Sequence, residues 1–143
     1  MFTRKASARY EGFGKEGKGH LSTESGVLDD VPYSFSTRFG DERGTNPEEL
    51  IAAAHAGCFT MALSNALATA GHTVERAHTT AKVDFGRDDK GPVIQKIELV
   101  SEVKAPGLTD ATLQEIAQKA KEGCPVSRAL ASVPSITLSI KLV

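Results

Sequence analysis

The longest apolar stretch of the chain, Leu50–Ala70, is hydrophobic on nearly every side when its residues are placed at helical spacing. Its flanks carry the usual signals of helix ends. Asn46 is a favourable N-cap, Pro47 suits the first helical position, and Gly71 is common just beyond the end of a helix. The pattern predicts one long helix over Pro47–Ala70.

Other segments alternate between hydrophobic and polar residues, which is the period of a strand with one buried face. The clearest example is Tyr33–Phe39, whose odd-numbered positions carry three aromatic rings and a threonine. The other predicted strands are Lys5–Tyr10, Gly19–Glu24, His78–Phe85, Val93–Lys104 and Ser135–Val143. A second helix is predicted over Asp110–Lys121, capped by Thr109, and a short one begins at Pro125. The order β-β-β-α-β-β-α-β indicates an α+β fold with mostly antiparallel sheet.

The long helix requires more covering surface than one small domain usually supplies. The 143 residues fit a single domain, 1–143. The small residues of the helix, which would let another backbone approach closely, are Ala52, Ala53, Ala54, Ala56 and Gly57. We therefore expect a homodimer that buries this helix.

Composition and charge narrow the possible partners. The net charge is −1, without the basic excess that is typical of proteins that bind nucleic acid or acidic membranes. Residues Met1–Lys5 are not followed by an apolar run, so we expect no secretory leader and a cytoplasmic location. The long helix is mostly alanine within a polar chain, which favours a buried helix over a membrane span.

The chain has two cysteines, Cys58 and Cys124, which are 66 residues apart and form no CxxC motif. Without an export signal both are expected to be reduced, either as inert core residues, as metal ligands or as a redox pair. Cys58 lies near the middle of the apolar helix, where burial raises a thiol pKa. Cys124 lies at the predicted start of a helix, where backbone N–H groups favour a thiolate.

Two alternatives use His55, three residues before Cys58. A zinc site could combine His55, Cys58 and Cys124, but structural zinc usually has four ligands in recognisable pairs, and His20, His72 and His78 are scattered. His55 could instead be the base for a Cys58 nucleophile, although such partners usually come from different elements. A buried histidine in a core is the simplest interpretation.

If Cys58 is reactive, a nearby cation has to stabilise its thiolate. Arg38 is the candidate, because it comes just before the Gly40–Gly44 turn that leads into the long helix. A buried guanidinium would need a carboxylate, which Glu48 or Glu49 could provide. Alternatively, Arg38 is a solvated strand residue and both glutamates only complement the helix dipole. The residues alone leave both interpretations open.

Several motifs, taken together, resemble one known family. The segments "TRF" at 37–39, "GTNPEELIAAAHAGCF" at 44–59 and "GCPVSRAL" at 123–130 are similar to the OsmC/Ohr family of thiol peroxidases. The form "AAHAGCF" and the early "STESGVL" at 22–28 resemble the OsmC branch more than Ohr. The resemblance covers essentially the whole chain and includes the predicted order of elements.

The resemblance implies a stress-defence peroxidase that acts on organic hydroperoxides, and less well on H2O2, with a dithiol as reductant. Cys58 would match the peroxidatic cysteine, which is oxidised to a sulfenic acid. Cys124 would match the resolving cysteine, which condenses with that sulfenic acid to an intrachain disulfide. Arg38 would match the thiolate-stabilising arginine and Glu48 the carboxylate that holds it. The implied assembly is an intertwined homodimer with interfacial active sites, and it needs no haem, flavin or metal. A dimer that only binds apolar ligands, and a thiol redox sensor, remain alternatives.

Overall fold

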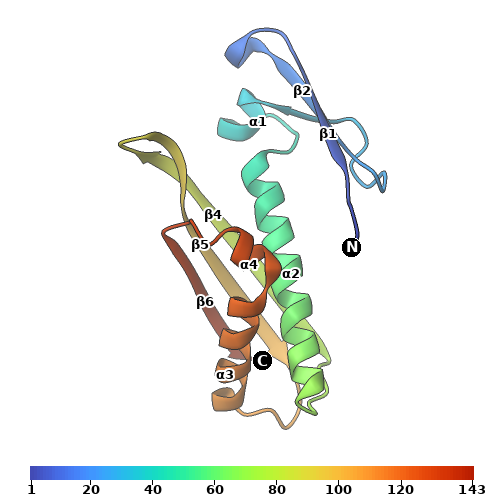
Figure 1. Cartoon of the computed structure of the whole chain (residues 1–143), viewed down its shortest axis with the longest axis vertical. Helices are drawn as coiled ribbons and strands as arrows, with labels where there is room; N and C mark the ends of the chain where they lie inside the picture. The colour runs from blue at the N-terminus through green and yellow to red at the C-terminus, as the bar shows by residue number, and fades with distance from the viewer. The chain divides into compact units, whose positions relative to one another are not determined.

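The computed structural model describes residues 1–143, which fold as two compact units, Met1–Leu50 and Ile51–Val143. The elements in chain order are β1 (Ala6–Glu11), the 3-10 turn η1 (Gly14–Glu16), β2 (Lys18–Thr23), β3 (Val31–Ser34), α1 (Phe35–Phe39), α2 (Pro47–Thr69), β4 (Arg76–Asp88), β5 (Gly91–Lys104), α3 (Asp110–Gly123), α4 (Pro125–Ala129) and β6 (Ser135–Leu142) (Figure 1). The predicted α+β class is confirmed, and the predicted order holds with α1 added. The prediction of a single domain stays a prediction.

The first unit contains a small antiparallel sheet in the order β1-β2-β3. Its buried residues are all small or polar: Gly17, Gly19, Thr37 and Thr45. Every residue of β1 is exposed. This unit therefore has no apolar core of its own.

The predicted strand Tyr33–Phe39 is wrong beyond Ser34, where the chain turns into helix α1. Ser34 and Thr37 form a reciprocal capping box, in which Ser34 Oγ accepts the Thr37 N–H at 3.2 Å and Thr37 Oγ1 accepts the Ser34 N–H at 2.7 Å. The rings of Phe35 and Phe39 lie 4.6 Å apart, centroid to centroid. Four residues along a strand would separate them by about 13 Å, so only a helix permits this contact.

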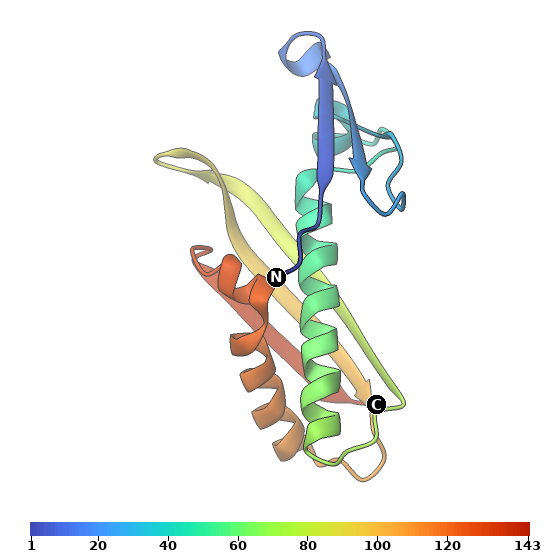
Figure 2. The same ribbon diagram turned by 45° about the vertical axis from the view of Figure 1, so that its right-hand side comes forward.

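The second unit contains a three-stranded sheet in the order β4-β5-β6. The β4–β5 hairpin is antiparallel as predicted, but β6 pairs with β5 in parallel. The chain between these two strands includes α3 and α4, and a crossover of this kind brings the chain back in the same direction. The two views of the ribbon show α2 and α3 on the same face of this sheet (Figure 2).

The core of the second unit lies between these helices and the sheet. Phe59, Leu63 and Leu67 recur every four residues on α2 and are fully buried. A line of hydroxyl groups also ties α2 to the sheet: Thr60 Oγ1 donates to Thr79 Oγ1 at 2.8 Å, and Thr79 Oγ1 lies 3.0 Å from Ser101 Oγ. These contacts fix where the helix segment that carries Cys58 lies along the sheet and how it is rotated about its axis.

The ends of α2 follow the sequence signals closely. Asn46 Oδ1 accepts the N–H of Glu49 at 2.8 Å, which confirms the predicted N-cap. Gly71 adopts φ +89° beyond the last turn, and His72 N–H bonds to the Leu67 carbonyl at 3.0 Å. This is a Schellman C-cap, which requires a residue that tolerates positive φ. The helix therefore begins where it was predicted and ends one residue earlier.

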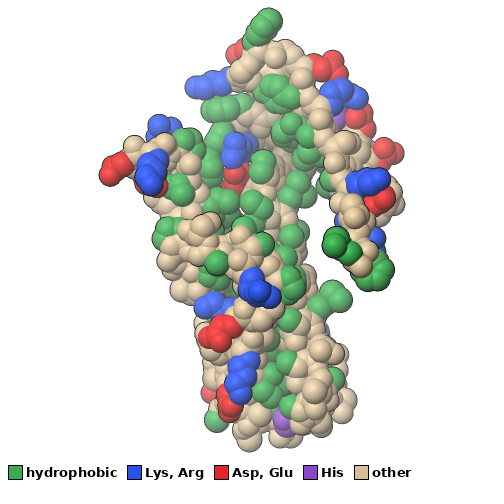
Figure 3. Space-filling view, in the orientation of Figure 1, with side chains coloured by type: hydrophobic (Ala, Val, Ile, Leu, Met, Phe, Trp, Pro, Cys, Tyr) green, Lys and Arg blue, Asp and Glu red, His purple; other side chains and the backbone are tan.

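Most of α2 is not covered within one chain, and the expectation that a homodimer buries this helix stays a prediction. Its buried residues are His55, Phe59, Leu63 and Leu67, whereas Met61 is 75% exposed. The space-filling view shows hydrophobic side chains reaching the surface beside this helix (Figure 3). By length and composition α2 is the one helix that could cross a membrane, a property shared by core helices of soluble proteins.

Candidate active site

Cys58 and Cys124 interact through their side chains in the second unit, although they are distant in the sequence. Both thiols are free. Cys58 lies on α2 and is partly exposed, whereas Cys124 is the C-cap of α3 and the N-cap of α4 and is fully buried. The structure therefore pairs one accessible thiol with one enclosed thiol.

The environment of Cys124 favours its thiolate, as predicted for a helix start. Burial raises the pKa of Cys124, but the backbone N–H of Ser127, the thiol of Cys58, the Ser127 hydroxyl and the N–H of Val126 together outweigh burial and lower it. The Cys124 sulfur does not form an N-cap hydrogen bond of ordinary geometry. The stabilisation is thus shared among several nearby donors.

The environment of Cys58 favours its neutral thiol. Burial raises the pKa of Cys58 first, the Val126 N–H acts in the opposite direction, and the neighbouring Cys124 raises it further. A second thiolate beside the first would place two like charges in contact. Cys58 therefore requires an additional positive charge to react as a nucleophile at neutral pH.

Arg38 and Glu48 form a close ion pair in the first unit. Arg38 Nε donates to both Glu48 oxygens, at 3.2 Å to Oε1 and 3.0 Å to Oε2, and Arg38 Nη2 also bonds to Oε1. The hydrogen bond to Glu48 raises the pKa of Arg38. The Arg38 side chain is 33% exposed and that of Glu48 13%. The guanidinium is therefore held in a fixed orientation, and within one chain it is only partly buried.

Glu49 has a different set of contacts from its neighbour. Its carboxylate accepts from Thr45 Oγ1 at 2.9 Å, and its backbone N–H is bonded to the Asn46 cap. The two glutamates are adjacent in the first turn of α2, but they bond to different partners. Glu48 holds Arg38, and Glu49 belongs to the helix start.

His55 is completely buried and lies on the same helix as Cys58. Its Nε2 is 2.7 Å from Ser127 Oγ, and its Nδ1 has no hydrogen-bond partner. Burial lowers the pKa of His55, and the positive charge of Lys121 lowers it further. The structure brings no three His, Cys, Asp or Glu side chains together as a potential metal site.

Ser127 is not among the residues that the sequence singles out, yet it touches both His55 and Cys124. The available signal was its place three residues after Cys124. A side chain at the third position of a helix can reach back toward the N-cap residue.

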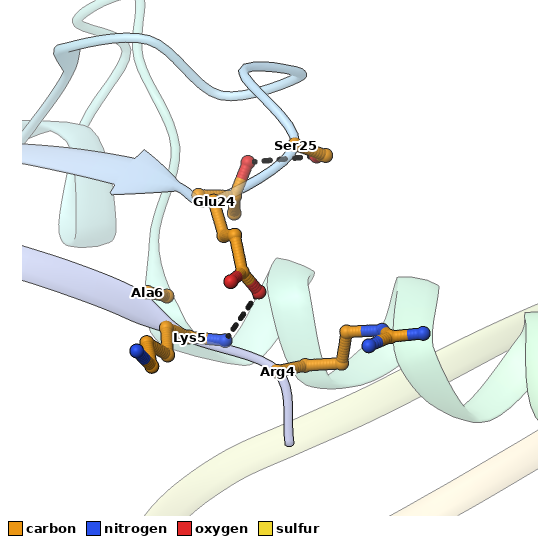
Figure 4. A pocket seen from close by; sticks show the side chains of 6 residues that line it. Arg4, Lys5, Ala6, Glu24 and Ser25 are labelled. Carbon is orange, nitrogen blue, oxygen red and sulfur yellow. Dashed lines mark hydrogen bonds between the residues drawn. The ribbon is translucent and has the colours of Figure 1, made fainter. Parts of the chain in front are cut away.

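A shallow pocket in the first unit has a volume of about 570 Å³. It is lined by Arg4, Lys5, Ala6, Thr23, Glu24 and Ser25. The Glu24 carboxylate accepts the backbone N–H of Lys5 at 3.3 Å, so this acid links the start of β1 to the end of β2 (Figure 4). The pocket contains neither a cysteine nor a histidine, and we assign it no chemistry.

Two interacting thiols, one of them at a helix start, form the arrangement that thiol redox chemistry uses. Comparison with known proteins identifies the family. Residues 40–139 match the family described as OsmC-like protein. Peroxiredoxin OsmC of Escherichia coli is 54% identical over 139 residues, which cover 97% of this chain and 96% of that protein. The chain belongs to the OsmC-like family and is a peroxidase.

Two further comparisons support this assignment. Organic hydroperoxide resistance protein OhrA of Bacillus subtilis is 35% identical over 101 residues, 69% of each protein. The crystal structure of the organic hydroperoxide resistance protein OhrB of Bacillus subtilis matches with a TM-score of 0.75 at 28% identity, covering 98% of both chains. The OsmC/Ohr resemblance and its OsmC branch are thereby confirmed.

Proposed function

We propose that this peroxidase reduces organic hydroperoxides with Cys58 as the attacking thiolate and Cys124 as the resolving thiol. One observation carries the proposal: the fold brings two thiols from separate elements into contact, with only Cys58 partly open to solvent. A bulky hydroperoxide reaches the exposed member of the pair, and the buried member is already in place for the next step.

The proposed steps balance in atoms and electrons. The Cys58 thiolate attacks the terminal oxygen of ROOH, so that an S–O bond forms, the O–O bond breaks and RO⁻ leaves to become ROH. The Cys124 thiolate then attacks the sulfur of the Cys58 sulfenic acid, which forms the disulfide and releases hydroxide as water. A dithiol reductant returns both cysteines to thiols by exchange and becomes a disulfide itself.

The Arg38 guanidinium, held by Glu48, supplies the positive charge in this proposal. The pKa of Cys58 is raised by burial, so its thiolate needs a cation close by. The contacts of Glu48 hold the guanidinium fork in one orientation. Other N–H groups of the guanidinium can donate to the peroxide oxygen that leaves.

The preference for organic hydroperoxides rests on the apolar surroundings of Cys58 and on its relatives. Cys58 packs against the hydrophobic core, and Met61 on the next turn of α2 is exposed. Phe59 and Leu63, two other large apolar residues near Cys58 on α2, are fully buried in the core and do not add to this exposed surface. Two relatives are named for resistance to organic hydroperoxides.

Mass spectrometry after one equivalent of cumene hydroperoxide tests this function. We expect one Cys58–Cys124 disulfide within each chain, formed faster than with one equivalent of H2O2. Repeated turnover should follow when a dithiol such as dihydrolipoamide is added. A disulfide that forms without turnover would indicate a redox sensor, and no oxidation of either cysteine would refute the peroxidase mechanism.

We also propose that the chain is a homodimer. The first unit buries no hydrophobic residue. Exposed Ala53, Gly57 and Met61 follow one another at four-residue spacing on α2. A second copy would cover both the thin sheet of the first unit and this stripe.

Met61→Glu is expected to weaken such a dimer by roughly 100-fold, because a carboxylate without a partner is costly to bury at an interface. Sedimentation equilibrium of the wild type and the variant measures the change. Ala111→Glu at an exposed position of α3 is the control for one added negative charge. A wild-type protein that remains monomeric at micromolar concentration would refute the dimer.

A further inference from the structure

A hydrogen-bonded row connects α2 to the resolving cysteine through two residues to which the steps above give no role. His55 Nε2 lies 2.7 Å from Ser127 Oγ, and Ser127 is on the first turn of the helix that Cys124 caps. His55 and Cys124 are fully buried, and Ser127 is 9% exposed. The row is therefore closed to bulk water.

The unpartnered Nδ1 of His55 determines which atoms of this hydrogen-bonded row donate and which accept. A buried N–H without an acceptor is rarer and less favourable than a buried acceptor without a donor. In the neutral imidazole the proton is therefore assigned to Nε2, and Nδ1 is the bare nitrogen. Nε2–H then donates to Ser127 Oγ, which leaves the Ser127 hydroxyl proton free to point to the Cys124 sulfur.

We propose that His55 and Ser127 are positioning residues that stabilise the Cys124 thiolate and aim it at the oxidised Cys58. The proposal rests on the two-cysteine mechanism above and assigns the row to its second step. His55 and Ser127 donate hydrogen bonds and keep their protons. The S–S bond forms from Cys124, and hydroxide leaves from the Cys58 sulfenic acid.

The directions of the pKa shifts of Cys124 and His55 agree with this assignment. The Ser127 hydroxyl is one of the groups that lower the pKa of Cys124 against the effect of burial. Burial and Lys121 lower the pKa of His55, so the ring stays neutral and the tautomer argument applies at neutral pH. A neutral donor row stabilises an anion without adding a buried cation.

A pair of substitutions at His55 separates hydrogen-bond donation from other roles. His55→Leu removes the donor while it fills the site, whereas His55→Gln places an amide N–H near the position of Nε2. Ser127→Ala breaks the row at its centre and changes little volume. Rapid quenching after one equivalent of cumene hydroperoxide, with dimedone to trap sulfenic acid, measures Cys58 oxidation and disulfide formation separately.

We expect disulfide formation to slow about tenfold in His55→Leu and Ser127→Ala, since one pKa unit changes the thiolate fraction tenfold. Sulfenic acid at Cys58 should accumulate in both variants, and His55→Gln should recover most of the rate. Wild-type rates of disulfide formation in Ser127→Ala, or a His55→Gln variant as slow as His55→Leu, would overturn the proposal. Absence of sulfenic acid and disulfide in the wild type would instead refute the mechanism on which it rests.

Discussion

Replacing Cys58 with serine is expected to lower peroxidase turnover by roughly a thousandfold or more, the scale seen when an enzyme loses its nucleophile. A serine hydroxyl stays protonated at neutral pH and is a weak nucleophile without a base. Cys124 cannot take over, even though its pKa is lowered, because its side chain is fully buried. Reduction of cumene hydroperoxide, followed with an excess of dithiol, measures the loss.

Cys124→Ser is the matched control, because it leaves the attacking thiol in place. One equivalent of hydroperoxide should still oxidise Cys58, but the sulfenic acid should persist instead of forming a disulfide. Full turnover by the Cys58→Ser protein would contradict the assignment. Turnover by Cys58→Ser together with inactivity of Cys124→Ser would transfer the attacking role to Cys124.

The sequence predicted the fold best where local signals decide the structure. Asn46, Pro47 and Gly71 define the ends of α2 by capping chemistry that is contained within a few residues. The error over Phe35–Phe39 arose because alternation of aromatic residues also fits one turn of helix, and the Ser34–Thr37 capping box decided between them. The direction of β6 depends on pairing with β5, which no local pattern contains.

The candidate site was likewise predictable where local signals decide the structure, and not where tertiary packing does. The lowering of the pKa of Cys124 follows from its place at a helix start, which the sequence indicates directly. The choice of Glu48 over Glu49 as the partner of Arg38 depends on which side of one helical turn each carboxylate faces. The contact of His55 with Ser127 joins residues 72 positions apart, so it needs the packing of α2 against α4. Motifs therefore indicated the candidate site residues, and tertiary structure supplied their neighbours.

Arg38→Met is expected to lower the second-order rate with organic hydroperoxide about 100-fold at pH 7. An opposite charge shifts a pKa by about one to three units, and each unit changes the thiolate fraction tenfold. Burial raises the pKa of Cys58, and without the proposed guanidinium nothing would offset that rise. The deficit should therefore be largest at neutral pH and shrink as the pH rises through that pKa, which the pH dependence of iodoacetamide alkylation of Cys58 measures in a Cys124→Ser background.

Glu48→Gln and Glu49→Gln form the matched pair for this experiment. Both remove one negative charge from the first turn of α2, but Glu48 bonds to Arg38 whereas Glu49 bonds to Thr45. We expect about a tenfold loss for Glu48→Gln, because the guanidinium loses its fixed orientation, and almost none for Glu49→Gln. Equal losses in the two variants would show that the helix start matters and not the ion pair. A deficit in Arg38→Met that does not change with pH would mean that Arg38 acts on the peroxide alone, because only a shift in the pKa of Cys58 makes the deficit depend on pH.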